Sequence, residues 1–344
     1  VAFRELESPR FNILGLNRSR FKEFEFLGIL SFRDPIRPHV KEVIREIERA
    51  GIKTVIVTGD HRGTAEAVAK ELGFKLGEGA VLDGREIDSI APAELARKLG
   101  ALKVFSRVTP EGKLKIVKAY QASGEIVAMT GDGINDAPAL IQADIGVAVG
   151  SGTEVAKEAA DLVILDDNFE TLAAAIEEGR KILENVRKVL VYLLSTVLDE
   201  IFLLVGSILF ALPLPMGALQ ILWVNFFAES FPAMAFSFDR SGGKAIYPME
   251  RKKIFDPQVK ILIWGFGVFS SLLLFTLYYS LLKLGFGLEE TRSFVFLCFG
   301  VYSLFLIFSI KELRKPIFSY NPFANPYLSL SVVLGVGLIA SGVY

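Results

Sequence analysis

The segment that decides the fold of the first half of the chain is Glu125-Ile-Val-Ala-Met-Thr-Gly-Asp-Gly-Ile-Asn-Asp-Ala-Pro-Ala-Leu140. Its first five residues are mostly apolar and predict a strand, and the glycines that follow predict a tight turn before a helix. Asp132, Asn135 and Asp136 crowd two carboxylates and an amide into this turn. The segment therefore predicts a strand–turn–helix unit with polar side chains at the carboxyl end of the strand.

The same pattern occurs earlier, where the apolar run 53–57 is followed by Thr58-Gly-Asp60. Strand-like runs alternate with helical stretches, which is typical of βαβ units and predicts a doubly wound α/β domain with a parallel sheet. The expected strands are 26–32, 53–57, 104–105, 125–129, 145–149 and 162–165, and the helices include 40–50 and 110–122. Ligands bind such sheets at the carboxyl ends of the strands, where both Thr-Gly-Asp sequences lie.

The second half of the chain is much more apolar. The 344 residues are 51% apolar, with a mean hydropathy of +0.43. Five stretches are long and apolar enough to cross a bilayer as helices, which disfavours the alternative of a large buried helical core. We predict membrane-spanning helices at 189–212, 218–238, 258–282, 291–310 and 326–344.

Basic residues predict the orientation of these spans. They gather before the first span, between the second and third, and after the fourth, for example at Arg187, Lys188, 251–253 and Lys311. Since basic loops face the cytoplasm, we expect a multi-pass protein of the plasma or inner membrane with a cytoplasmic N-terminal domain. The net charge of -1 indicates no nucleic-acid partner, and the single cysteine, Cys298, excludes an intramolecular disulfide.

The polar turns carry the residue types that phosphoryl transfer at an aspartate requires. Asp132 and Asp136 suit Mg²⁺, the Thr58 hydroxyl and nearby N–H groups suit phosphoryl oxygens, and Lys113 supplies a positive charge. Each residue alone fits an ordinary turn, helix cap or solvated lysine equally well. Their combination indicates a phosphoryl-transfer site.

At these motifs the chain resembles the P-type cation-transporting ATPases, whose catalytic domain has the haloacid-dehalogenase-like fold. The matching segments occur in family order at 34–37, 58–60, 105–113, 130–140 and 166–169. At least five expected spans, together with 221–225 and Phe231-Pro232, favour the calcium-pump class, because heavy-metal pumps have two spans there. The resemblance implies an ATP-driven pump for a hard cation, with Ca²⁺ favoured and with ATP and Mg²⁺ as cofactors.

The resemblance also implies a role for each matching residue. Asp132 is expected to bind Mg²⁺, with Asp136 beside it. The expected phosphate-holding residues are Thr58, Gly59, Lys113 and Asn135. Asp60 and Arg107 are expected to contact the nucleotide, and Asp34 and Arg37 to set the hinge and the nucleotide face.

The family's phosphorylated aspartate lies in an Asp-Lys-Thr-Gly-Thr sequence, which these residues do not contain. We expect residues 1–25 to end a nucleotide-binding domain, 26–185 to form a partial phosphorylation domain and 186–344 to form the C-terminal membrane domain. The expected partners are a lipid bilayer, ATP, the cation and an N-terminal half from the same gene or another chain. Without that half, this chain is expected to be inactive.

Acidic residues inside the predicted spans point to a cation path, since such residues are costly and usually functional. Glu200 lies near mid-bilayer, and Asn225 and Glu229 share a helix face just before Pro232, which should free carbonyl oxygens. The resemblance places all three polar residues where calcium pumps hold their ions. Structural pairing of Asp199 and Glu200 within the bundle is the alternative, and Mn²⁺, H⁺ or Na⁺ stay open as transported ions.

Two other functions stay open. The chain could be a non-catalytic membrane protein that binds cations or regulates a complete pump, or it could be one half of a split pump. The combination of Thr58, Lys113 and Asp132 favours a pump, because a regulator has no physical need for it.

Overall fold

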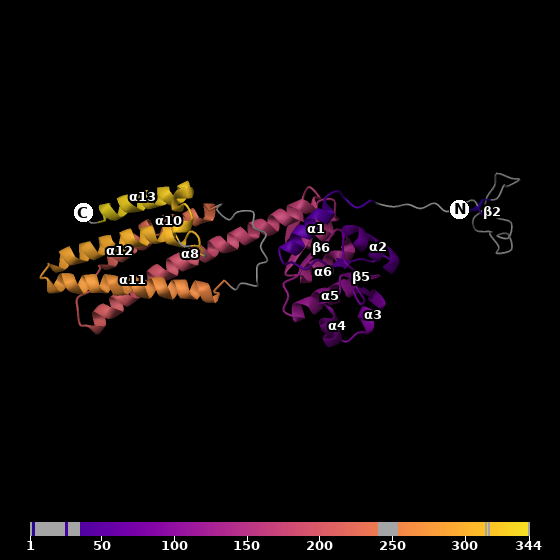
Figure 1. Ribbon diagram of the computed structural model, residues 1–344, viewed down its shortest axis with the longest axis horizontal. Coiled ribbons are helices and arrows are strands. Elements are labelled where there is room, and N and C mark those ends of the chain that lie inside the picture. Colours follow the sequence, from indigo (N-terminus) through magenta and orange to yellow (C-terminus); the bar gives the residue numbers. More distant parts are fainter. Residues whose placement is uncertain are drawn as a thin grey trace.

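The computed structural model describes residues 2–3, 25–26, 35–239, 254–313, 315 and 317–342. An α/β domain and a bundle of long helices lie at opposite ends of one long helix, α8 (Figure 1). The strands are β1 (Ala2–Phe3), β2 (Glu25–Phe26), β3 (Ile56–Val57), β4 (Val81–Asp83), β5 (Val104–Ser106), β6 (Ala128–Gly131), β7 (Ile145–Val149) and β8 (Leu162–Ile164). The helices of the α/β domain are α1 (Val40–Arg49), α2 (Arg62–Leu72), α3 (Gly84–Ser89), α4 (Pro92–Lys98), α5 (Pro110–Ala122), α6 (Ala137–Gln142) and α7 (Glu154–Glu158).

The parallel strands form two sheets of three strands each within the described residues. The strand orders are β3-β5-β4 and β6-β7-β8, and every pair in them is parallel. Helices connect successive strands, so the predicted doubly wound α/β class is confirmed. The split into two sheets is a difference from the single sheet expected, and it leaves β3 and β6 as edge strands.

Several predicted elements agree closely with the structure. Helix α5 and strand β7 have the predicted bounds, and α1 is one residue shorter than expected. The segment that contains β4, α3 and α4 was not predicted, because a three-residue strand beside glycines has too little periodicity to be recognised. Most of the expected strand 26–32 lies outside the described residues, as do the basic stretch 251–253 and Asp34.

Helix α8 (Phe169–Leu209) runs without interruption for 41 residues, which is about 62 Å at the helical rise. Its first turns pack against α1, where the Arg180 guanidinium donates a hydrogen bond of 2.7 Å to the Ala50 carbonyl. Its last turns lie in the helical bundle (Figure 1). The predicted domain boundary at 185/186 falls inside this helix, and the division into domains stays a prediction.

The bundle contains α8, a second span built from α9 (Ala218–Trp223), a π-helical turn (Val224–Ala228), α10 (Ser230–Ala235) and η5 (Phe236–Phe238), then α11 (Pro257–Lys283), α12 (Leu288–Ile310) and α13 (Pro326–Ser341). Four of these helices in the described residues are long and apolar enough to cross a membrane. Five spans were expected, but α13 has only 16 residues, or about 24 Å.

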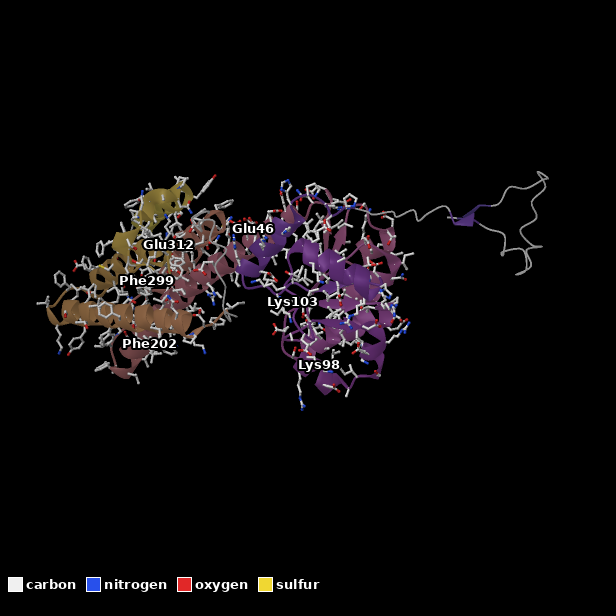
Figure 2. The ribbon with its side chains drawn as sticks, turned by 45° about the vertical axis from the view of Figure 1, so that its right-hand side comes forward. Glu46, Lys98, Lys103, Phe202, Phe299 and Glu312 are labelled. Atoms are coloured by element: carbon white, nitrogen blue, oxygen red, sulfur yellow. The ribbon has the colours of Figure 1, made fainter. Side chains whose placement is uncertain are left out.

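The surface of the bundle differs from that of the α/β domain. In Figure 2 nitrogen and oxygen atoms dot the domain that carries Lys98 and Lys103, whereas carbon predominates around Phe202. Large apolar side chains point outward from the bundle, including Leu219 at 82% exposed and Ile261 at 70%. Such a surface is stable against lipid chains and costly in water.

A substitution at Gly84 can test how closely the segment after β4 packs against Arg107. A Cβ at this position would lie 2.1 Å from the Arg107 carbonyl oxygen. We expect Gly84→Ala to displace Arg107 and to lower the free energy of opening of β4 and β5 by about 1–3 kcal/mol, as overpacking does. Hydrogen exchange of the full chain measures this change. Gly100→Ala is the matched control, since its Cβ would meet nothing within 4 Å, and an equal loss in both variants would contradict the prediction.

Candidate functional site

The loop after β3 carries the first group of predicted residues. The Thr58 hydroxyl accepts a hydrogen bond of 3.1 Å from the Asp60 N–H, and the Thr58 carbonyl accepts one from the Val108 N–H. The Arg107 N–H donates to the Asp60 carbonyl at 2.9 Å. Thr58, Gly59, Asp60 and Arg107 therefore meet at the carboxyl ends of β3 and β5. The Arg107 side chain lies 3.8 Å from the Asp83 carboxylate, a partner that the sequence did not indicate.

The loop after β6 carries the second group. The buried Asp136 carboxylate accepts hydrogen bonds from the N–H groups of Asp132 (3.3 Å) and Gly133 (3.4 Å), and it pairs with the Lys113 ammonium. The Asn135 side chain is exposed nearby. Because Lys113 belongs to α5, which follows the Arg107 segment, this ion pair ties the two loops together. Asp136 thus organises the turn, whereas the exposed Asp132 carboxylate has no hydrogen bond or ion pair within the described part of the chain.

Two further loops border Asp132. The Thr153 N–H donates a hydrogen bond of 2.8 Å to the Asp132 carbonyl, and a Cβ on Gly152 would lie 3.1 Å from that oxygen. The Ser151 N–H donates to Asp167 at 2.9 Å. Hydrogen bonds from the Ser151 hydroxyl and N–H, together with the charge of Arg37, hold the pKa of the Asp167 carboxyl below its usual value.

Arg37 lies with this second group. Its guanidinium donates a hydrogen bond of 2.7 Å to the Asp167 carbonyl, so it borders the loops around Asp132. No hydrogen bond or ion pair joins it to Asp60 or Arg107 in the described structure. The sequence placed Asp167 in the matching segment 166–169 without assigning it a role, and it did not indicate the loop 150–153, although Gly150-Ser-Gly-Thr153 follows a predicted strand.

The donor set around Asp132 fits Mg²⁺ and a phosphoryl group. Oxygen ligands suit this ion, which keeps several waters and needs few protein carboxylates. Gly131 is required for this turn, because a Cβ there would lie 2.5 Å from the Asp136 Cβ and would displace its carboxylate. Lys113 provides the positive charge and the Thr58 loop provides exposed N–H groups at the same end of the domain.

A second polar site lies inside the helical bundle. Glu200 of α8 and Asn225 of the π-helical turn are joined by a hydrogen bond of 3.3 Å from the amide to the carboxylate. Glu229 follows that turn and accepts a hydrogen bond of 2.9 Å from the Thr196 hydroxyl. Glu200 is 8% exposed and Glu229 is 2% exposed. The structure therefore brings the three predicted cation ligands to one region and adds Thr196, which lies one turn before Glu200.

The oxygens of this site are only partly satisfied. Glu200 Oε1 and Glu229 Oε1 are buried without hydrogen-bond partners in the described structure. The π-helical turn interrupts the regular backbone pattern, and the Glu229 N–H bonds to the Val224 carbonyl five residues earlier. No group of three or more His, Cys, Asp or Glu side chains gathers at one point in the searched residues. A cation here would therefore use two carboxylates together with amide, hydroxyl and backbone oxygens.

In comparisons with known proteins, the α/β domain and the C-terminal part of the helical bundle match two different family models. Residues 5–144 match the haloacid dehalogenase-like hydrolase model, and residues 213–344 match the model for the C-terminus of cation-transporting ATPases. The chain is 42% identical to the "Calcium-transporting ATPase" of Bacillus subtilis over 94% of its own length and 37% of that protein. It is 35% identical to the human "Calcium-transporting ATPase type 2C member 2" over 90% of its own length and 34% of that protein. The chain thus spans little more than a third of these relatives.

The Lys113–Asp136 pair generates a stability prediction. Asp136→Asn keeps the volume but leaves the largely buried Lys113 ammonium without its counter-charge. We expect the free energy of opening of the turn at 131–136 to fall by about 2–4 kcal/mol, measured by hydrogen exchange of the full chain. Glu94→Gln, which breaks an exposed pair with Lys98, should cost less than about 1 kcal/mol. Similar small losses in both variants would show that Asp136 does not hold the turn.

Proposed function

Because the chain corresponds to the C-terminal part of the P-type cation-transporting ATPases, we propose that it is the ion-carrying and phosphorylation-domain portion of an ATP-driven calcium pump. It is a multi-pass membrane protein, and its α/β domain lies on the cytoplasmic side. The observation that carries the proposal is the meeting of Glu200, Asn225 and Glu229 inside the bundle.

Two buried carboxylates match the charge of one divalent cation. A Ca²⁺ ion that leaves water needs six to eight oxygens, and it accepts carboxylate, amide, hydroxyl and backbone donors. Glu200, Glu229, Asn225 and Thr196 supply such oxygens within a low-dielectric bundle. A proton or a monovalent ion would leave one of the two carboxylates uncompensated, which is costly at this depth.

At the other end of α8, Asp132 would hold Mg²⁺, which neutralises charge on a phosphoryl group when bound. Lys113 and Thr58 would orient the phosphoryl oxygens, with Gly59 and Asn135 beside them, and Asp136 would keep the Lys113 ammonium in place. Asp60, Arg107 and Arg37 would border the nucleotide. These roles follow from the matching motifs and from the positions of these residues at the carboxyl ends of the strands.

The edges of the two sheets support an N-terminal partner segment. Strands β3 and β6 end their sheets in the described residues, and each leads directly into a loop that carries site residues. Ile126, just before β6, is 79% exposed although it is apolar. A strand from the N-terminal half of a pump would pair with one or both edges and would bring an acceptor carboxylate beside Asp132 and Thr58.

The Mg²⁺ role of Asp132 can be tested by Mn²⁺ binding, followed by electron paramagnetic resonance in a Glu229→Gln background that weakens the membrane site. Asp132→Asn should lower Mn²⁺ affinity at least about tenfold, because it removes the unpartnered carboxylate of the turn. Glu154→Gln is the control, since this glutamate of α7 is 81% exposed and pairs only with the neighbouring Lys157 among described contacts. Equal effects of the two substitutions would mean that the ion binds to diffuse surface charge.

The cation role of Glu229 can be tested with radioactive Ca²⁺ and the purified chain in lipid nanodiscs. Glu229→Gln and Glu200→Gln should each lower Ca²⁺ affinity at least about tenfold, because each removes one of two compensating charges with little change in volume. Glu289→Gln, at an 85% exposed position of α12, should leave affinity unchanged. Wild-type Ca²⁺ affinity in both bundle variants would overturn the proposal and favour a regulatory protein.

A further inference from the structure

Asp199 lies beside Glu200 in sequence but faces a different helix. Its carboxylate forms a hydrogen bond with the Ser270 hydroxyl of α11, whereas Glu200 meets Asn225 in the next span. Asp199 is fully buried and Ser270 is 4% exposed. Successive residues on a helix point about 100° apart, so the two acids of α8 face different helices, although the charge of Asp199 still acts on Glu229.

The Asp199 carboxylate is only partly hydrogen-bonded. The Ser270 hydroxyl lies within hydrogen-bond reach of both the Asp199 carboxylate and the Phe266 carbonyl, but it has one proton to donate. Asp199 Oδ2 has no hydrogen-bond partner in the described structure, and neither has the hydroxyl of Ser195, which is fully buried one turn earlier on α8. Carboxylate, hydroxyl and carbonyl oxygens therefore lie together here, and one carboxylate oxygen accepts no hydrogen bond from the described residues.

The close packing of α8 and α11 sets the size of this region. A Cβ on Gly267 would lie 2.8 Å from the Leu198 Cβ and 3.3 Å from the Ser195 carbonyl oxygen. The absence of a side chain at Gly267 thus lets α11 approach the turn of α8 that ends at Asp199.

No basic side chain of the neighbouring helices can compensate Asp199. Lys188 of α8 lies about 16 Å away along the helix, and Lys260 lies about 15 Å before Ser270 on α11. Helix α12, which places Tyr302 close enough to Asp199 for electrostatic interaction, has no Lys or Arg between Arg292 and its end at Ile310. The compensating charge must therefore come from a bound cation or a proton.

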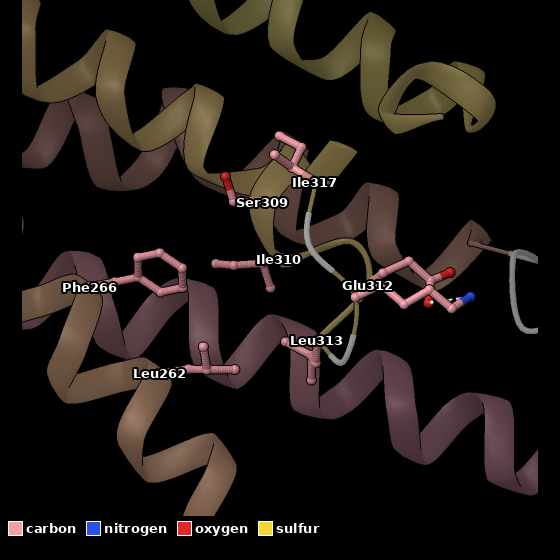
Figure 3. Close-up of a pocket in the computed structure, with 8 residues that line it drawn as sticks. Leu262, Phe266, Ser309, Ile310, Glu312, Leu313 and Ile317 are labelled. Carbon is pink, nitrogen blue, oxygen red and sulfur yellow. Dashed lines mark ion pairs between the residues drawn. The ribbon is translucent and has the colours of Figure 1, made fainter. Parts of the chain in front are cut away.

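A pocket at the cytoplasmic end of the bundle extends as far as Phe266. Its volume is about 310 Å³, and it is lined by residues of α11, α12 and the segment after α12 (Figure 3). Glu312 and Phe266 lie far apart along it in Figure 3. Phe266 lies one helical turn before Ser270, and its carbonyl is one of the converging oxygens. At the other end of the pocket Glu312 forms an ion pair of 3.7 Å with Lys315.

We propose that Asp199, Ser270, Ser195 and the Phe266 carbonyl form a second ion site that binds Na⁺, next to the divalent site at Glu200 and Glu229. One carboxylate with neutral oxygens balances a single positive charge, whereas a divalent ion would leave one charge in excess. The three acids Asp199, Glu200 and Glu229 are thereby balanced by one divalent and one monovalent cation.

Radioactive Na⁺ binding to the full chain in lipid nanodiscs, with choline as the replacement cation, tests the proposal. The wild-type chain should bind Na⁺, and Asp199→Asn should lower that affinity at least about tenfold while Ca²⁺ affinity changes less than about threefold. Glu229→Gln should show the reverse pattern. The Ser270→Ala variant should lower Na⁺ affinity by a smaller factor, because it removes one neutral ligand.

Ser207→Ala is the matched control, since this fully buried serine of α8 bonds to the Leu203 carbonyl two turns beyond Asp199. Absence of Na⁺ binding in the wild-type chain, or unchanged Na⁺ affinity in both Asp199→Asn and Ser270→Ala, would overturn the proposal and leave Asp199 as a neutral structural acid. If the Asp199→Asn variant does not fold, Na⁺ binding to the wild-type chain and to the Ser270→Ala variant tests the proposal. Loss of Ca²⁺ binding alone would contradict the proposed function and leave this site standing.

Discussion

The continuity of α8 is the constraint on which the rest of the structure depends. One backbone hydrogen-bonded helix begins at Phe169, directly after the Asp167 loop that contacts Ser151, and carries Asp199 and Glu200 into the bundle. Because α8 is uninterrupted, it connects the loops around Asp132 rigidly to the buried acids. A displacement of one end of such a helix is carried to the other end. A break in α8 would remove the continuous connection between the loops around Asp132 and the acidic residues of the bundle.

Two buried ion pairs connect α8 to the neighbouring spans of the bundle. Lys188 lies 2.8 Å from Asp239, at the end of the second span, and Arg187 lies 3.1 Å from Asp256, at the start of α11. Both basic side chains are almost fully buried, so removing either acidic partner would weaken the compensation of a buried charge. These pairs connect α8 to the spans on both sides of it at the cytoplasmic end of the bundle.

The sequence predicted most of the fold and fewer of the contacts. Long elements such as α5 and the apolar helices follow from periodicity, and the glycine-rich turn at 130–140 follows from its composition. The Lys113 partner of Asp136 lies 23 residues away, so local pattern does not pair them. The sequence did not indicate Thr196 or Ser270, because the partner of a hydroxyl in an apolar helix depends on which helix packs against it. The division into two sheets likewise depends on strand pairing that no single segment specifies.

The distribution of charge along the bundle makes ions part of its energetics. Basic side chains lie at the cytoplasmic end, where Arg187, Lys188 and the buried Lys311 occur, whereas the carboxylates of Asp199, Glu200 and Glu229 lie deeper. Burial lowers the pKa of Lys311, as expected for an ammonium removed from water. The acids have no such basic neighbours at their depth, and three ionised carboxylates without counter-charge would repel one another in a medium that screens poorly. The packing of α8 against α11 and the second span is therefore most stable when positive charge is present, so the binding of cations and the arrangement of these helices are two aspects of one equilibrium.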